Sequence, residues 1–218
     1  MPIPRAYVFD AYGTLLDVHS VLQRAAATIP GDLNALSQLW RRKQLEYTWL
    51  RALMGRYDDF QAVTEAALRA SAQELAIPIA DSQVAQLMQA YLHPAAFDDA
   101  RPALEALKSH PLAILSNGTP AMLDAAFQHN GLARYFTAII SVDRIKTYKP
   151  SPRVYALGPD ALHLPAPEIL FVSSNFWDAA GAKSFGYQVC WCNRSAAPME
   201  NLGFTPDLTI HSLDELVK

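Results

Sequence analysis

The chain has 218 residues, a formal net charge of −3, 51% hydrophobic residues and 18% charged residues. The length suffices for one sizeable core, or for a core with a smaller subdomain. The weak charge and the lack of like-charge blocks argue against nucleic-acid or membrane-surface binding, and no segment reaches transmembrane length. Asp10 interrupts the N-terminal apolar stretch, which argues against a signal peptide and favours a soluble cytoplasmic protein.

The first predicted element is a short apolar strand, residues 7–9, that stops at Asp10. Such a run is typical of a buried parallel strand. Open α/β sheets bind ligands at the carboxyl ends of their strands, so Asp10 falls at a chemically useful place. Taken alone, however, Asp10 would be interpreted as a cap for the turn that follows.

Residues 16–97 show helical periodicity and no convincing strand. Asp59 and Asp81 are candidate N-caps of two helices in this block. We therefore expect residues 16–97 to form an all-helical cap subdomain. Residues 1–15 and 98–218 are then expected to form one core domain.

In the second part of the chain, predicted strands alternate with short helices. The predicted strands cover residues 111–115, 137–142, 168–172, 187–192 and 208–210. The predicted helices cover residues 103–109, 120–129 and 179–185, with another starting at residues 151–152 and a terminal helical turn at 213–217. This alternation predicts an α/β fold with a doubly wound, Rossmann-like parallel sheet. A crevice between such a sheet and a cap is a natural small-molecule site.

Cys190 and Cys192 are two residues apart on one predicted strand. Residues at this spacing share a strand face, which is a poor geometry for a disulfide. Further metal ligands are not clustered near them in the sequence. We expect buried free thiols in a reducing compartment.

Polar side chains follow four of the predicted strands, and in a parallel sheet they would converge on one edge. These groups are Asp10, Ser116-Asn117-Gly118, Lys149, and Ser173-Ser174-Asn175 with Asp178. One such group is compatible with an ordinary turn or cap. Four together indicate a catalytic site.

The order of these groups resembles the haloacid dehalogenase superfamily, and the resemblance covers essentially the whole chain. Asp10 with Gly13-Thr14 is similar to the first motif and its nucleophile. Ser116 is similar to the second motif, Lys149 to the third, and Asp178 to the surviving acid of the fourth. A cap inserted just after the first motif is common in this superfamily, in agreement with the helical block.

Two positions differ from the pattern of the superfamily's phosphatases. Tyr12 stands where their first motif carries a second carboxylate, and Ser174 stands where their fourth motif carries another Asp. Mg²⁺ sites usually include carboxylates, and phosphoryl transfer without the metal lacks its main charge stabiliser. These two differences argue against a metal site, and we expect no cofactor.

The motifs are most similar to those of the L-2-haloacid dehalogenases. The likeness lies in residues 9–15 (FDAYGTL), 39–49 (LWRRKQLEYTW), 115–118 (LSNG), 148–150 (YKP) with Tyr155, and 172–178 (VSSNFWD). Five segments in the right order make the likeness specific. It implies hydrolysis of short-chain (S)-2-haloalkanoic acids to (R)-2-hydroxy acids and halide. The implied route is an ester on Asp10, with inversion and without metal.

The resemblance also implies roles for individual residues. The implied catalytic residues are Asp10, Thr14, Arg41, Ser116, Lys149, Tyr155, Ser173, Asn175 and Asp178. The implied substrate- or halide-binding residues are Ala11, Tyr12, Arg41, Leu45, Phe60, Ser116, Asn117 and Trp177. Taken alone, Arg41 and Lys149 read as solvated surface cations. By the same standard, Leu45, Phe60 and Trp177 read as ordinary core packing.

Two other functions stay open from the sequence. One is a Mg²⁺-dependent small-molecule phosphatase of the same superfamily, which Tyr12 and Ser174 disfavour. The other is a non-enzymatic binding protein, which the complete set of charged site positions disfavours. The resemblance implies a homodimer that takes a 2-haloacid and water. It leaves open the chain length, the halogen, the residue that activates water, and the effect of Arg42, where close relatives carry glutamine.

Overall fold

The computed structural model describes residues 2–24 and 29–217. Its centre is a six-stranded sheet in the order β5-β4-β1-β6-β7-β8, in which every pair of neighbours is parallel. The strands are β1 (Ala6–Phe9), β4 (Leu112–Ser116), β5 (Ala138–Ser141), β6 (Ile169–Ser173), β7 (Gln188–Cys192) and β8 (Leu208–Ile210). The predicted parallel α/β sheet is confirmed, and the strand predicted at residues 208–210, β8, lies at its edge as expected.

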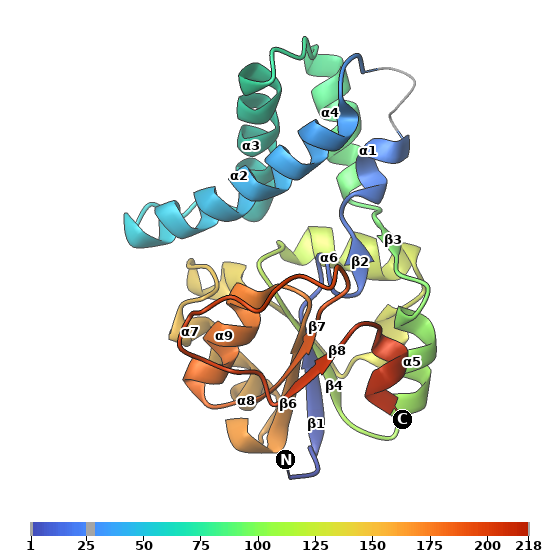
Figure 1. Ribbon diagram of the computed structural model, residues 1–218, viewed down its shortest axis with the longest axis vertical. Helices are drawn as coiled ribbons and strands as arrows, with labels where there is room; N and C mark the ends of the chain where they lie inside the picture. Colours follow the sequence, from blue (N-terminus) through green and yellow to red (C-terminus); the bar gives the residue numbers. More distant parts are fainter. Residues whose placement is uncertain (1, 25–28, 218) are drawn as a thin grey trace.

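Helices cover both faces of the sheet, so β1, β4, β6 and β7 are buried along their whole length. One face carries α5 (Ala100–Leu107) and α6 (Pro120–His129), and the other carries α7 (Pro152–Tyr155), α8 (Leu157–Leu162) and α9 (Phe176–Phe185) (Figure 1). Short 3₁₀ helices complete the core at η1 (Ala133–Tyr135), η2 (Val142–Ile145), η3 (Ala166–Glu168) and η4 (Leu213–Val217).

The strand order makes the end of β1 the natural place for a site. From β1 the chain passes to β4 and β5 on one side, then to β6 and β7 on the other. Ligands of such sheets bind where the order reverses, beyond the carboxyl ends of the strands. Asp10 directly follows β1, and its N–H donates to the carbonyl of Val172 on β6 at 2.9 Å. The fold therefore places Asp10 at the reversal point.

Four helices stand over the carboxyl ends of the strands (Figure 1). They are α1 (Ser20–Arg24), α2 (Leu33–Leu53), α3 (Phe60–Glu74) and α4 (Asp81–Tyr91). None of the described helices combines the length and the apolar character needed to cross a bilayer. α2 projects well beyond the other elements at its C-terminal end.

Side-chain caps explain where two of these helices begin. The Asp32 carboxylate accepts hydrogen bonds from the N–H groups of Asn34 and Ala35 at the start of α2. Asp59 accepts from Ala62 N–H at 2.8 Å, so its predicted role as the cap of α3 is confirmed. The prediction for Asp81 was wrong by one residue, because Asp81 is already helical and Ala80 precedes it.

The expectation of no strand in residues 16–97 was also wrong. β2 (Leu16–Asp17) pairs antiparallel with β3 (Ala95–Ala96), so the two chain segments that join the four helices to the sheet run side by side. A two-residue strand carries no alternation to reveal it in the sequence. A further difference is that α9 begins at Phe176, three residues before the predicted start, which places Trp177 and Asp178 in its first turn.

Candidate active site

Asp10 is a buried carboxylate held by three donors. Its Oδ1 accepts a hydrogen bond from Lys149 Nζ at 3.0 Å. Its Oδ2 accepts from Thr14 Oγ1 and from Asn175 Nδ2, each at 3.0 Å. A carboxylate has about four acceptor positions, so this arrangement fixes the group in one orientation and leaves a lone pair to react.

Lys149 joins the two carboxylates of the site. Its side chain is 1% exposed, and Nζ lies 3.0 Å from Asp10 Oδ1 and 2.8 Å from Asp178 Oδ2. Burial by itself lowers the pKa of Lys149, but the Asp10 and Asp178 charges outweigh it and raise that pKa above its usual value. The interpretation as a solvated surface lysine was wrong, and the residue supplies a permanent buried cation.

Asp178 is the second carboxylate and is fully buried. Its Oδ1 accepts a hydrogen bond from the Tyr155 hydroxyl at 2.8 Å. Burial raises the pKa of Asp178, and the Asp10 charge adds to this, although Lys149 acts in the opposite direction. A carboxylate with a raised pKa is a stronger base, so Asp178 has the chemistry to accept a proton from water.

The segment after β6 supports Asp10 through its backbone. Ser174 N–H donates to Thr14 Oγ1 at 2.9 Å, which leaves the Thr14 hydroxyl proton to point at Asp10. Asn175 N–H donates to Ser173 Oγ at 3.2 Å. Asn175 precedes α9, but its side chain binds Asp10 and makes no hydrogen bond to cap the helix. The local preference of an N-cap residue is therefore overridden by the site.

Ser116 and Asn117 are buried at the carboxyl end of β4, the strand beside β1. Ser116 Oγ accepts from Gly118 N–H at 3.2 Å. Asn117 Oδ1 accepts from Lys149 N–H at 3.1 Å. The Asn117 oxygen is thereby occupied, and its NH₂ group is the part of the side chain left to donate.

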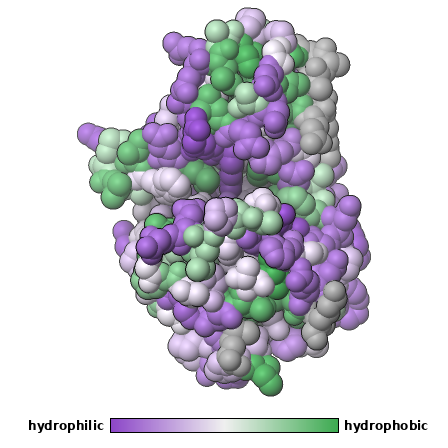
Figure 2. Space-filling model, viewed as in Figure 1, coloured by the Kyte–Doolittle hydropathy of each residue, from purple (hydrophilic) through white to green (hydrophobic). Residues whose placement is uncertain are grey.

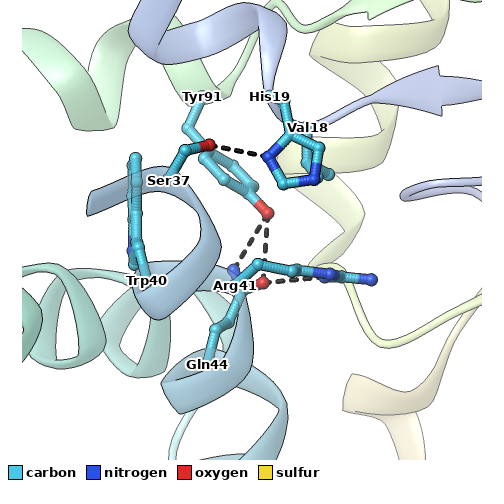
Figure 3. A pocket seen from close by; sticks show the side chains of 7 residues that line it. All are labelled: Val18, His19, Ser37, Trp40, Arg41, Gln44 and Tyr91. Carbon is cyan, nitrogen blue, oxygen red and sulfur yellow. Dashed lines mark hydrogen bonds between the residues drawn. The ribbon is translucent and has the colours of Figure 1, made fainter. Parts of the chain in front are cut away.

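Arg41 reaches from α2 to the core. Its Nη2 donates to the Tyr12 carbonyl at 3.0 Å. Its Nη1 donates to Gln44 Oε1 at 2.7 Å, as Figure 3 shows. The interpretation as a solvated surface arginine was wrong, since both ends of the guanidinium are bound. Arg41 therefore brings a positive charge from the cap into contact with the segment that follows Asp10.

The aromatic residues of the predicted pocket wall lie at two places. The Tyr12 and Phe60 rings are 5.7 Å apart, and both are buried, so Phe60 also serves as cap core. Trp177 meets the ring of Trp49 edge-on at 5.4 Å and lines a pocket of about 670 Å³ with Tyr148 and Lys149. The pocket links the projecting end of α2 to the lysine of the site.

The positions of two further residues that the resemblance implied, Ala11 and Leu45, say less about a role in substrate binding. Ala11 is fully buried, and its carbonyl accepts from the N–H groups of Leu15 and Leu16, both at 3.0 Å. Ala11 thus shapes the turn after Asp10. Leu45 is half-buried on α2, one turn beyond Arg41. Its role in substrate binding stays a prediction.

Sequence reasoning assigned no role to a buried hydrogen-bond network behind Arg41. Gln44, Thr64 and Tyr91, from α2, α3 and α4, meet there at 2.6–3.2 Å. Gln44 lies three residues after Arg41 on the same helix, a spacing that brings side chains together. That spacing was the feature of the sequence from which the contact between Gln44 and Arg41 could have been predicted. Among the residues that the structure describes, there is no group of three or more His, Cys, Asp and Glu arranged to hold a metal ion.

Comparison with known proteins agrees with this arrangement. The family model for haloacid dehalogenase-like hydrolases matches residues 4–186. The chain belongs to the haloacid dehalogenase-like hydrolases. The resemblance recognised from the sequence motifs is therefore confirmed, and so is the α/β fold class predicted from the alternation of strands and helices.

Relatives within this family match over nearly their full length. The (S)-2-haloacid dehalogenase H-109 of Pseudomonas putida is 46% identical over 96% of this chain and 94% of its own length. The (S)-2-haloacid dehalogenase of Pseudomonas sp. (strain YL) is 47% identical over 98% and 93%. The solved L-2-haloacid dehalogenase of Xanthobacter autotrophicus with chloropropionic acid covalently bound is 40% identical, covers 99% of this chain and 97% of its own, and superposes with a TM-score of 0.92.

Proposed function

We propose that this haloacid dehalogenase-like hydrolase converts short-chain (S)-2-haloalkanoic acids and water to (R)-2-hydroxy acids and halide. The observation that carries the proposal is the buried Asp10 carboxylate, which Lys149 holds, with Tyr12 and Ser174 at the two positions where a phosphatase would carry further carboxylates. The names of the full-length relatives, at 46% and 47% identity, support the same activity. The proposal assigns residues 1–15 and 98–218 to the core and residues 16–97 to the cap.

In the first step, an Asp10 carboxylate oxygen attacks the substrate α-carbon from the side opposite the halogen. A carbon–oxygen bond forms, and the carbon–halogen bond breaks with its electron pair leaving on the halide. Attack from behind inverts the configuration. The fixed orientation of Asp10 favours this step, since three donors hold the carboxylate in place.

In the second step, water attacks the side-chain carbonyl carbon of the Asp10 ester. Asp178 takes one proton from this water and passes it to the leaving oxygen, so the 2-hydroxy acid departs with the original ester oxygen. The second water proton is released as Asp10 returns to its carboxylate form with one oxygen from water. The raised pKa of Asp178 suits it to this role. Tyr155, Ser173, Asn175 and Thr14 hold the two carboxylates and the loop around them.

The charges of substrate and leaving group need donors at two places. Arg41, with the Asn117 NH₂ and the Trp177 indole, is assigned to the departing halide, where negative charge develops. Ser116 and nearby backbone N–H groups are assigned to the substrate carboxylate. Tyr12, Leu45, Phe60 and Trp177 would form the apolar wall around the alkyl group.

The residues present do not fit a Mg²⁺ site, and the proposal needs no cofactor. Tyr12 and Ser174 replace two of the carboxylates such a site would use. The two carboxylates that remain, Asp10 and Asp178, share the ammonium of Lys149 at 3.0 and 2.8 Å. The positive charge of Lys149 therefore balances one of the two carboxylates that remain.

The proposal includes a cytoplasmic homodimer. Cys190 and Cys192 are buried free thiols, in keeping with a reducing compartment. Leu53 and Met54 are 85% and 63% exposed at the projecting end of α2, where Figure 2 shows apolar atoms gathered. An apolar projection of this kind suits contact with a second copy of the chain. Sedimentation of the purified protein tests the dimer.

The deciding experiment is a single turnover of (S)-2-chloropropionate in ¹⁸O-water, with enzyme in excess and EDTA present. We expect halide release, label in the Asp10 side chain and little label in the first product. Label entering the first product directly would show that water attacks the substrate itself. Absence of halide release would favour a binding protein, and Mg²⁺-dependent phosphate release from phosphoesters would favour a phosphatase.

A further inference from the structure

A buried glutamine lies behind the arginine that the proposed function assigns to the halide. We propose that Gln44 is a positioning residue, which holds the Arg41 guanidinium at the catalytic edge of the core and so sets how well the departing halide is stabilised. This inference rests on the proposed function, because that function makes Arg41 the halide donor. It adds a residue to which the sequence motifs gave no role.

Arg41 is held by one hydrogen bond to the core and one within the cap. Nη2 donates to the Tyr12 carbonyl. Nη1 donates to Gln44 Oε1 at 2.7 Å (Figure 3). Gln44 is 1% exposed, whereas Arg41 is only partly buried. A long arginine side chain has many rotamers, so a rigid buried partner reduces the freedom that binding a halide would otherwise have to remove.

The orientation of the Gln44 amide follows from the hydroxyl beyond it. Thr64 Oγ1 donates its single proton to the Phe60 carbonyl at 2.5 Å. Thr64 can therefore only accept from Gln44 Nε2, which lies 2.6 Å away. The NH₂ group must face Thr64, and the amide oxygen must face Arg41. The reversed amide would set donor against donor at Arg41 and acceptor against acceptor at Thr64.

The same amide joins three helices of the cap. Gln44 is on α2, Thr64 is on α3, and Tyr91 on α4 has its hydroxyl 3.0 Å from Gln44 Nε2 and 3.2 Å from Oε1. Trp40 Nε1 donates to the Thr64 carbonyl at 2.7 Å and ties α2 to α3 again. Because these contacts are buried and mutually satisfied, Gln44 has little freedom to move without them. Arg41 is thus positioned by the packing of the cap, not by its own helix alone.

The consequence should depend on the leaving group. A donor aimed at developing charge typically contributes about 10²–10³-fold to a rate, and a small misplacement can remove about 10²-fold. We expect loss of Gln44 to lower kcat for a chloro substrate by about 10–100-fold. The loss should be smaller for a bromo substrate, because bromide leaves more easily and needs less stabilisation.

The test compares Gln44→Met with Gln188→Met on (S)-2-chloropropionate and (S)-2-bromopropionate. Gln188 is a matched control, since it is 6% exposed, bonds the Pro167 carbonyl at 2.6 Å, and lies at the opposite end of the sheet strands. Both variants should melt at a lower temperature than the wild type. Only Gln44→Met should raise the bromide-to-chloride ratio of kcat, which a purely structural defect would leave unchanged.

Gln44→Asn provides a second variant if Gln44→Met does not fold. It keeps an amide but shortens the side chain by one CH₂. We expect Arg41 to move with the shorter amide, away from the halide position, and to give the same change in halide preference. A folded Gln44 variant with the wild-type ratio, or the same shift in Gln188→Met, would overturn the inference. A wild-type chain that releases no halide defeats the proposed function, and this inference falls with it. Wild-type activity with an unchanged ratio defeats the inference alone.

Discussion

The two sides of the site are built from different chemistry. On the core side, Asp10, Lys149 and Asp178 are charged groups in direct contact and are almost completely buried. On the cap side, Arg41 is held by an amide, Gln44, and by hydroxyls and carbonyls behind it. Buried charged groups stabilise one another only while every partner is present. Neutral hydrogen-bonding groups orient a side chain with a smaller desolvation penalty. Charged contacts therefore dominate around Asp10, the proposed nucleophile, and neutral hydrogen bonds orient Arg41, the proposed halide donor.

Asp10→Asn should cause the largest loss of turnover of the variants on the core side. The amide keeps the volume of the carboxylate but is not a nucleophile, so we expect turnover to fall by at least about 10⁴-fold. Far-ultraviolet circular dichroism should stay that of the folded wild type. Steady-state halide release measures the loss. Activity within tenfold of wild type would remove Asp10 from the role of nucleophile.

Lys149→Met tests whether charge holds the core side together. It leaves two carboxylates buried without their cation, and we expect the free energy of unfolding to fall by about 3–5 kcal/mol. Urea denaturation measures the change. Lys183→Met is the control, because its pair with Asp207 is 31% and 25% exposed and should contribute less than about 1 kcal/mol. Equal losses in both variants would contradict the comparison.

Arg194→Met tests a charged pair that lies beside the reacting groups but is not among them. Arg194 binds Asp99 through two hydrogen bonds of 2.7 and 2.9 Å and also donates to the Thr14 carbonyl. Burial raises the pKa of Asp99, but Arg194, together with hydrogen bonds from Leu213 N–H and Ser212, outweighs it and lowers that pKa below its usual 3.8. At pH 7 we expect Arg194→Met to be less stable than wild type by about 2 kcal/mol.

The pH dependence of this difference has a definite sign. A carboxyl whose folded pKa is lowered contributes stability above its unfolded pKa and loses it as the pH falls through the folded value. The gap between wild type and Arg194→Met should therefore shrink as the pH falls below about 4. Urea titrations at a series of acid pH values measure it. A gap that widens in acid would contradict the assignment.

Arg42→Gln should have the smallest effect. Arg42 is exposed on α2, next to Arg41 in sequence but turned to solvent. We expect the free energy of unfolding to change by less than about 0.5 kcal/mol and kcat to stay within about threefold. Kinetics over a range of ionic strength check it. A large change in kcat would place Arg42 in the site and would add a second charged residue, beside Arg41, to the cap side.

Much of the core side could be predicted from the sequence. Short apolar runs revealed the buried strands, and the convergence of parallel strands at one edge then brought Asp10, Ser116 and Lys149 together. The free state and burial of Cys190 and Cys192 also followed from their spacing. These inferences succeeded because each depends on a local pattern and one general rule of sheet architecture.

The contacts on the cap side were harder to predict from the sequence, because they join residues far apart in the chain. Gln44 meets Thr64 and Tyr91, which are 20 and 47 positions further along the chain. Helical periodicity shows which residues face inward but not which inward residues meet. The two-residue strands β2 and β3 were not predicted for a related reason, because they are defined by their pairing and not by their composition.

The contact between Trp49 and Trp177 gives the enzyme a built-in optical reporter. Trp49 belongs to α2 and Trp177 to α9, so their rings, 5.4 Å apart, span the cap and the core. Any shift of α2 when a substrate enters changes the surroundings of both indoles and hence their emission. Trp40 and Trp191 are buried and hydrogen-bonded within one part of the molecule, and they provide a steady background. Tryptophan emission of the unlabelled protein would therefore report such a shift and its timing.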